Sequence, residues 1–149
     1  MGANSAFLLN YGYTFEVTEG LAGVTQLPIA AGITNVEPDS NEESDEKYYY
    51  DGGGLGERDV IGIMLTYAFS GDRDYNDAAQ NYIFGLATKT GPDRKTNFTV
   101  TEPNGDSYTG KATVSEIKLP GGDANSKGEV EFTISFDGLP TFTPAPVVP

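Results

Sequence analysis

Two glutamates, Glu129 and Glu131, alternate along a β-prone segment and form the carboxylate pair best placed to act together. A glycosidase needs two carboxyl groups about 5–10 Å apart beside a sugar cleft, and residues two apart on a strand point to the same side. Alternating glutamates on the outer face of a strand are more often simply solvated, and the sequence has no Trp that would stack on a sugar. The spacing therefore predicts a wet strand face rather than a hydrolytic centre.

Acidic residues also raise the question of metal binding. The segment DRDYN, which begins at Asp72, starts like a calcium-binding EF-hand loop. Its sixth and twelfth positions are Asp77 and Ile83, where such a loop requires Gly and Glu. A helix start with acidic caps explains the segment better. The acidic run from Glu37 to Glu46 could collect a divalent ion, but such runs are usually only solvated, so no metal is expected.

The residues that are absent exclude several chemistries. Without Cys or His among its 149 residues, the chain has no disulfide, thiolate nucleophile, zinc finger or Ser–His–Asp triad. The glycine-rich run at 52–56 lacks the Lys-Ser/Thr that completes a phosphate-binding loop. No segment approaches the roughly 18 apolar residues that span a membrane. We therefore expect no cofactor, no membrane span and no enzymatic activity.

The negative charge is concentrated in one segment. The chain has a formal net charge of −13, and residues 37–59 (EPDSNEESDEKYYYDGGGLGERD) hold nine of its 22 acidic residues with only two bases. A self-repelling, glycine-containing stretch is typical of an exposed loop. Adjacent aromatic side chains such as Tyr48, Tyr49 and Tyr50 usually pack against something. We expect this loop to contact a neighbouring molecule, and the overall charge argues against a protein that grips nucleic acid.

The remaining pattern predicts strands. Alternation at 128–138 places Val130, Phe132, Ile134 and Phe136 on one face, and alternation at 60–70 does the same for Ile61, Ile63, Leu65, Tyr67 and Phe69. Further strands are expected around 98–100 and 108–117, joined by the turn sequence PNGD. Weaker strand signals lie in the N-terminal third.

One helix is predicted after the sequence GDRDYN, with Asp77 in its first turn and with apolar residues at helical spacing at Ala79, Tyr82, Ile83 and Leu86. Residues 139–149 contain four prolines and are expected to form an extended arm. The prediction is a single, mainly β domain over residues 1–149: a β-sandwich or barrel with one α-helix. An N-terminal arm (1–12), the acidic Tyr/Gly loop (37–59) and the proline-rich C-terminal arm (139–149) extend from it.

The order of these pieces resembles the major tail proteins, or tail tube proteins, of long-tailed bacteriophages and prophages. The resemblance covers about residues 30–143 and rests on three segments taken together: GITNVEPDSNEESDEKYYYDGGG, DVIGIMLTYAFSGDRDYNDAAQNYIFGL and GDANSKGEVEFTISFDGLPTFTP. It implies a structural virion protein, made in the host bacterial cytoplasm, whose hexameric rings stack into a hollow tube around the tape measure protein. Tail terminator and distal tail or baseplate proteins are further implied partners, and DNA transits the lumen without specific binding. The family has no catalytic residues to carry over.

With this resemblance, the candidate site residues are contact residues. The subunit or ring interface is expected to include Glu42, Glu43, Asp45, Glu46, Tyr48, Tyr49, Tyr50 and Phe142. Glu129 and Glu131 are the candidates for the lumen, because the polar face of a core strand must meet water. The alternative is a β-sandwich module that binds a ligand or carbohydrate, as in an adhesin. That alternative predicts a monomer with a ligand, whereas a tube protein assembles with itself.

Overall fold

The computed structural model describes residues 7–146, and within this range the fold is mainly β. The strands are β1 (Thr14–Val17), β2 (Leu27–Pro28), β3 (Ile33–Asp39), β4 (Glu43–Tyr48), β5 (Gly56–Gly62), β6 (Thr66–Asp72), β7 (Lys95–Thr101), β8 (Ser107–Gly121), β9 (Glu129–Phe136) and β10 (Thr141–Thr143). One α-helix, α1 (Ala78–Gly85), follows β6. The high β content and the α-helix confirm the predicted fold class.

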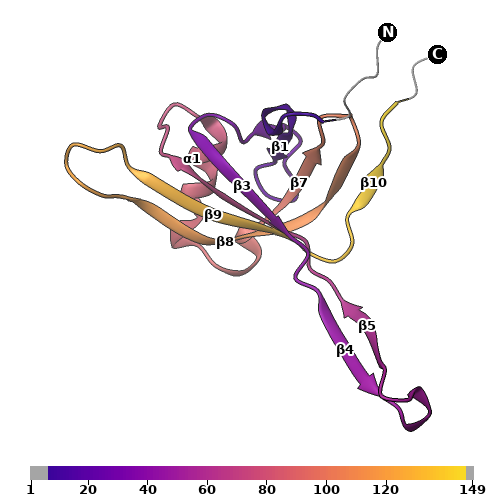
Figure 1. The fold of residues 1–149 in the computed structure, drawn as a ribbon. Helices are drawn as coiled ribbons and strands as arrows, with labels where there is room; N and C mark the ends of the chain where they lie inside the picture. Colours follow the sequence, from indigo (N-terminus) through magenta and orange to yellow (C-terminus); the bar gives the residue numbers. More distant parts are fainter. Residues whose placement is uncertain (1–6, 147–149) are drawn as a thin grey trace.

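One antiparallel sheet forms most of the molecule, in the order β2-β1-β7-β8-β9-β6-β3. The long strand β8 pairs with β7 through its first half and with β9 through its second half. β10 pairs with the first residues of β8, on the side where β9 has ended. The sheet curls into a half-barrel without closing (Figure 1).

The curl brings β1 against β6, although three strands separate them in the sheet. The rings of Phe15 and Phe69 meet edge to face with centroids 5.1 Å apart. Phe69 in turn stacks on Phe132 of β9 at 4.9 Å. Each buried aromatic side chain of this kind stabilises the fold by about 2–3 kcal/mol. The apolar face predicted for residues 128–138 lies in this core, as expected.

The helix α1 begins at Asp77, whose carboxylate accepts a hydrogen bond from the Gln80 N–H at 3.0 Å. Asp77 is therefore the N-cap, one position before the first turn in which the sequence placed it. The fully buried Gln80 side chain donates to the carbonyls of Ala31 and Asp72, at 2.8 and 3.1 Å. Its oxygen accepts from the N–H of Asp74 at 2.9 Å. These bonds fix the helix to the chain around the end of β6.

The prediction of one strand over residues 60–70 is wrong. β5 and β6 are separate strands of different sheets, and the chain changes sheet between them. As a result Ile61 and Ile63 are 63% and 54% exposed instead of sharing the core with Phe69. Alternation does not reveal the change, because the apolar period continues unbroken across the junction.

The acidic segment 37–59 is more regular than the predicted loop. Its first residues complete β3, and the rest belongs to the β4–β5 ribbon, a two-stranded sheet that projects from the body (Figure 1). Gly53 and Gly54 have φ angles of 62° and 88° at the tip, where glycine relieves the strain of a left-handed backbone. Some of the glycines expected to loosen the segment instead turn the hairpin.

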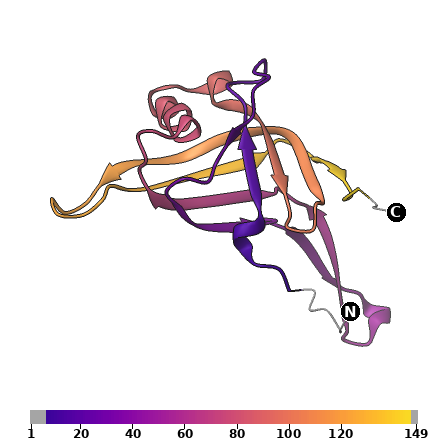
Figure 2. The same ribbon diagram turned by 90° about the horizontal axis from the view of Figure 1, so that it is seen from above.

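A second hairpin, formed by the far ends of β8 and β9, points away from the body in another direction. Figure 2 shows these two hairpins at opposite ends of the half-barrel. Of the predicted arms, residues 1–6 and 147–149 lie outside the described residues. Within residues 7–12 the chain makes a short turn at Asn10–Gly12, and within residues 139–146 it forms β10.

Candidate assembly surfaces

The polar face of the half-barrel is built by β3, β6, β9 and the second half of β8. Strand registers align side chains in rows across it, one of which is Asn35, Ser70, Glu131 and Lys118. In the next row, Glu129 lies opposite Asp72. Glu129 and Glu131 are both exposed, as the sequence predicted for a wet strand face. The far ends of these strands thus form an acidic, solvated surface.

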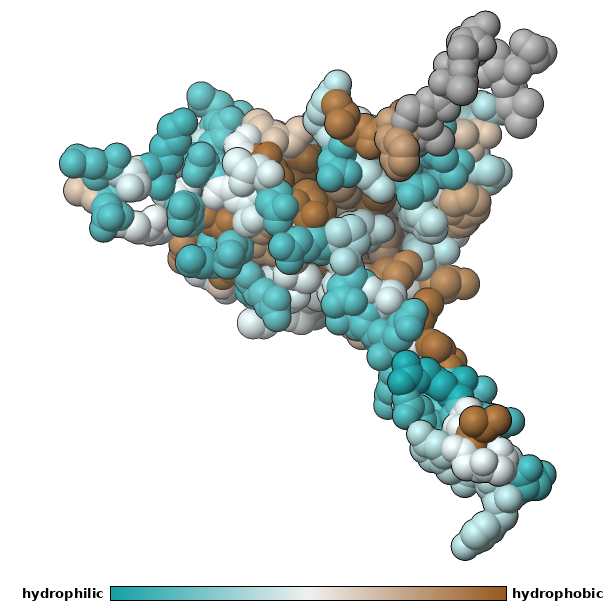
Figure 3. Space-filling model, in the orientation of Figure 1, coloured by the Kyte–Doolittle hydropathy of each residue, from teal (hydrophilic) through white to brown (hydrophobic). Residues whose placement is uncertain are grey.

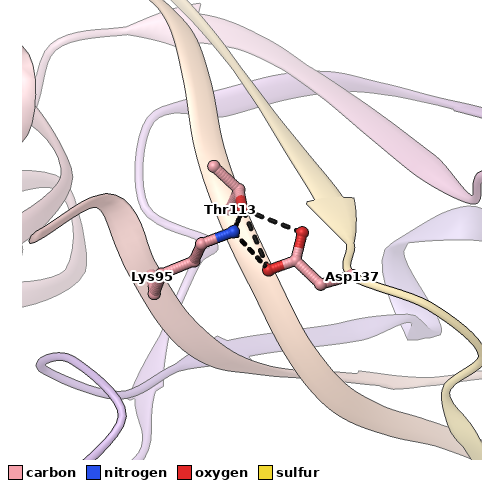
Figure 4. Close-up of polar contacts among 3 residues, drawn as sticks. All are labelled: Lys95, Thr113 and Asp137. Carbon is pink, nitrogen blue, oxygen red and sulfur yellow. Dashed lines mark hydrogen bonds and ion pairs between the residues drawn. The ribbon is translucent and has the colours of Figure 1, made fainter. Parts of the chain in front are cut away.

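At the other end of this face, a lysine is neutralised by its neighbours (Figure 4). The Lys95 ammonium donates to the carboxylate of Asp137 at 2.8 Å and to the hydroxyl of Thr113 at 2.7 Å. The Thr113 hydroxyl donates to Asp137 at 2.9 Å. An exposed pair of this kind adds at most about 1 kcal/mol to stability. Its clearer effect is to offset a positive charge on a negative face.

Two strand edges flank the polar face and carry no partner strand within residues 7–146. β3 pairs only with β6. β7 accompanies β8 as far as Thr113, and beyond it β8 has β9 on one side alone. Arg94 donates to the Val114 carbonyl at 3.2 Å, which leaves residues 115–121 as the open part of that edge. Open strand edges offer backbone N–H and C=O groups to another chain.

The β4–β5 ribbon carries charges on both faces. Asp45 lies directly opposite Asp59, and like charges in that position destabilise a ribbon. The Lys47 ammonium, 3.7 Å from Asp45, relieves part of this repulsion. On the other face Arg58 forms an ion pair with Glu46. A two-stranded ribbon is marginally stable alone, so this projecting one is suited to packing against another chain.

Exposed apolar side chains mark both ends of this ribbon. They are Tyr49, Tyr50 and Leu55 at the tip, and Val60, Ile61, Ile63 and Met64 at the root. Figure 3 shows apolar surface at both places, separated by a hydrophilic stretch. Neighbouring apolar residues that stay exposed typically mark an interaction site.

The residues predicted for the interface fall on two elements. Seven of them lie in or beside β4 and its turn: Glu42, Glu43, Asp45, Glu46, Tyr48, Tyr49 and Tyr50. The eighth, Phe142, lies on β10, where its ring packs 5.1 Å from that of Tyr108 and stays 49% exposed. Their role in an interface remains a prediction. The open edge of β8, including Lys118 and Leu119, was missed, although the alternation after Ile117 extends toward Gly121.

Two tyrosines that pack against the core, Tyr67 and Tyr108, have raised pKa values. Burial, and then the neighbouring Tyr108, Tyr13 and Glu102, raise the pKa of Tyr67 to about 12. Burial also raises the pKa of Tyr108, with Glu102 and Asp106 adding to the effect. Both hydroxyls therefore keep their protons at neutral pH, which suits packing rather than acid–base chemistry.

A groove of about 380 Å³ opens between β1 and β3, where the half-barrel does not close. Its lining is mostly apolar and includes Tyr13, Phe15, Ile29, Ile33, Val36 and Tyr67. Among residues 7–146, no three acidic side chains converge as a metal site. In the same range, no helix has the length and apolar character needed to cross a membrane.

Comparison with known proteins identifies the fold. No family model and no curated protein sequence matches the chain. The tail of an empty gene transfer agent particle, determined with C6 symmetry, matches with a TM-score of 0.72 and 18% identity, over 93% of this chain and 100% of that one. The SPP1 tail tube matches with a TM-score of 0.59 and 14% identity, over 89% and 78% of the two chains. This chain has the tail tube fold.

The tail tube fold also extends to contractile systems. A chain of the sheath–tube complex of an extracellular contractile injection system matches with a TM-score of 0.55 and 15% identity, over 93% of this chain and 92% of that one. The resemblance inferred from the order of sequence segments is thus confirmed in the fold. The similarity includes most of the chain in each of these comparisons.

Proposed function

We propose that this chain is a structural virion protein whose hexameric rings stack into a phage tail tube through which DNA is delivered. The observation that carries the proposal is an open half-barrel whose polar face ends, within residues 7–146, in an unpaired strand edge on each side, in a fold shared with a tail of C6 symmetry. The proposed role is structural and non-enzymatic, in line with neighbours that are tail and tail tube chains. The proposed location is the virion, after synthesis in the host cytoplasm.

The strand directions support the proposed ring. β8, β9, β6 and β3 alternate in direction, because each pairs antiparallel with the next. Rotation about a tube axis preserves direction, so β3 of one copy runs antiparallel to β8 of the next. Edge-to-edge pairing then extends the four strands of each copy around the ring. The acidic polar face would line the lumen and repel DNA, which then passes without specific binding.

The two hairpins support the proposed stacking. They leave the half-barrel at opposite ends (Figure 2), so each ring presents the β4–β5 ribbon toward one neighbour. The apolar tip and root of the ribbon are the proposed contacts between rings or subunits. The partners proposed beyond the tube itself are the tape measure protein in the lumen, a tail terminator, and distal tail or baseplate proteins.

The test is to purify the chain, concentrate it, and combine negative-stain electron microscopy with light scattering. Rings or hollow tubes with sixfold end views are expected. A species that stays monomeric at high concentration, and also when seeded with preformed tail tips, would contradict the proposal. A glycan-binding signal from that monomer would favour the binding-module alternative.

A further inference from the structure

Lys118 is an exposed base among acids on the open edge of β8. Its neighbour in register is Glu131, and Glu129 and Asp72 occupy the adjoining row. None of the ion pairs within residues 7–146 includes Lys118. The outer side of β8 has no partner strand at this position. The lysine is therefore free to contact a chain that docks along this edge.

The opposite open edge, β3, presents carboxylates on the same polar face. Glu37 lies opposite Ala68 in the register with β6 and is exposed. Asp39 already accepts a hydrogen bond from the Asn41 N–H at 3.0 Å. Among the described residues, the Glu37 carboxylate accepts a hydrogen bond from the Asn35 side chain alone, at 3.3 Å. Of the two acids, Glu37 is the better available partner for an incoming cation.

The other face of the same two edges is complementary in apolar character. Leu119, next to Lys118 on β8, points away from the polar face and is 56% exposed. On β3, Ile33 and Val36 pack partly against the core and line the groove beside β1. Leu119 would cover these residues if the two edges met. Burial of the exposed leucine side chain would favour such a contact.

We propose that Lys118 of one copy pairs with Glu37 of the next copy and sets the register between neighbours, with Leu119 covering Ile33 and Val36. This proposal rests on the proposed ring, and it names residues of the seam, the contact between β8 of one copy and β3 of the next. Pro38 lacks an N–H, so backbone pairing at the seam uses residues 33–37 of β3. A shift of two residues one way would place Lys118 beside Asn35 and Glu37 beside Glu116, which like-charge repulsion disfavours. A shift of two residues the other way would bring Lys118 to Asp39, whose carboxylate already accepts a hydrogen bond from the Asn41 N–H.

Charge reversal tests the pair. Lys118→Glu alone and Glu37→Lys alone each place like charges across every seam, so tube yield should fall about tenfold or more. The double variant Lys118→Glu/Glu37→Lys restores opposite charges and should restore assembly. A one-to-one mixture of the two single variants should also assemble, because copies that alternate around a six-membered ring meet with opposite charges at every seam.

Matched controls separate the seam from overall charge. Lys89→Glu and Glu19→Lys, at two exposed positions beside α1, change the net charge by the same amounts and should leave tube yield unchanged. Tubes are counted by electron microscopy and weighed by sedimentation, and folding is checked by circular dichroism. Single variants that assemble like wild type would overturn the pair, as would a mixture and a double variant that both stay unassembled. Wild-type chain that forms no tube would overturn the proposed ring itself.

Discussion

The ring of Tyr48 lies against the backbone of Gly56, its partner across the β4–β5 ribbon. A Cβ atom at Gly56 would lie 2.9 Å from two atoms of that ring, which is closer than side chains approach one another. Glycine thus allows the ring to lie flat on the ribbon. Tyr48 is part of the ribbon, whereas Tyr49 and Tyr50 extend from its tip.

Replacing Gly56 by Val should displace the Tyr48 ring and lower tube yield. The melting temperature of the core should stay the same, because the ribbon belongs to a separate sheet. Gly52→Ala is the control, since nothing lies within 4 Å of a Cβ at that position. Circular dichroism melting and electron microscopy measure the two effects. A Gly56→Val core that melts early would contradict the independence of the ribbon.

Replacing Tyr49 and Tyr50 together by Ala should block assembly while the monomer stays folded. Both rings are exposed and contribute little to the core, whereas a buried aromatic anchor at an interface is worth about 2 kcal/mol or more. Tyr75→Ala, at an exposed tyrosine beside α1, serves as the control. Light scattering and electron microscopy report assembly. If tubes form equally well without these two tyrosine side chains, the tip of the ribbon is not part of the interface.

Replacing Gln80 by Ala should lower the free energy of unfolding by about 2 kcal/mol or more, because it leaves the carbonyls and N–H that Gln80 satisfies without partners. Asp77→Ala removes only the N-cap and should cost about 1 kcal/mol. Asp93→Ala, at an exposed acid, is the control. Urea denaturation followed by circular dichroism gives the values, and equal losses for the three variants would refute this ranking.

Alkaline pH should destabilise the chain through Tyr67. Well below pH 10, the ordinary pKa of tyrosine, folded and unfolded chains both keep the Tyr67 proton. Between pH 10 and 12 the unfolded chain releases a proton that the folded chain retains, so stability falls. Tyr67→Phe should flatten this fall, and Tyr75→Phe should not. Denaturant midpoints across this pH range provide the measurement, and equal slopes for wild type and Tyr67→Phe would contradict the assignment.

Local patterns in the sequence were sufficient to predict several of the strands. Alternation alone predicts β9. The turn sequence PNGD between β7 and β8 requires a residue with a positive φ, and Gly105 provides it with a φ of 100°. The change of sheet between β5 and β6 was not predictable, because it depends on which strands pair rather than on the apolar period. The composition of residues 37–59 is typical of a loop, but pairing between β4 and β5 makes most of this segment a two-stranded ribbon.

The candidate site was predictable to a similar degree. The exposure of Glu129 and Glu131 followed from strand alternation, and the exposure of Tyr50 followed from its charged surroundings. The open edges at β3 and β8 could not be inferred, because an edge is defined by the strand that is missing beside it. No local sequence signal sets Lys118 apart from other lysines, whereas the sheet order places it on an open edge.

Charge reversal at Glu129 and Glu131 tests the proposed lumen. Changing both to Lys adds four positive charges per copy, and in an assembled tube these would gather on the polar face of every ring. DNA should then bind to these tubes, and its affinity should fall as the salt concentration rises. The bound DNA should resist nuclease, because the tube encloses it. Glu19→Lys/Asp93→Lys adds the same charge beside α1, away from the polar face, so any DNA it binds should be digested. Nuclease protection followed by gel analysis distinguishes the two positions. Tubes of the Glu129→Lys/Glu131→Lys variant that leave DNA unbound, or hold it open to nuclease, would place these residues outside the lumen.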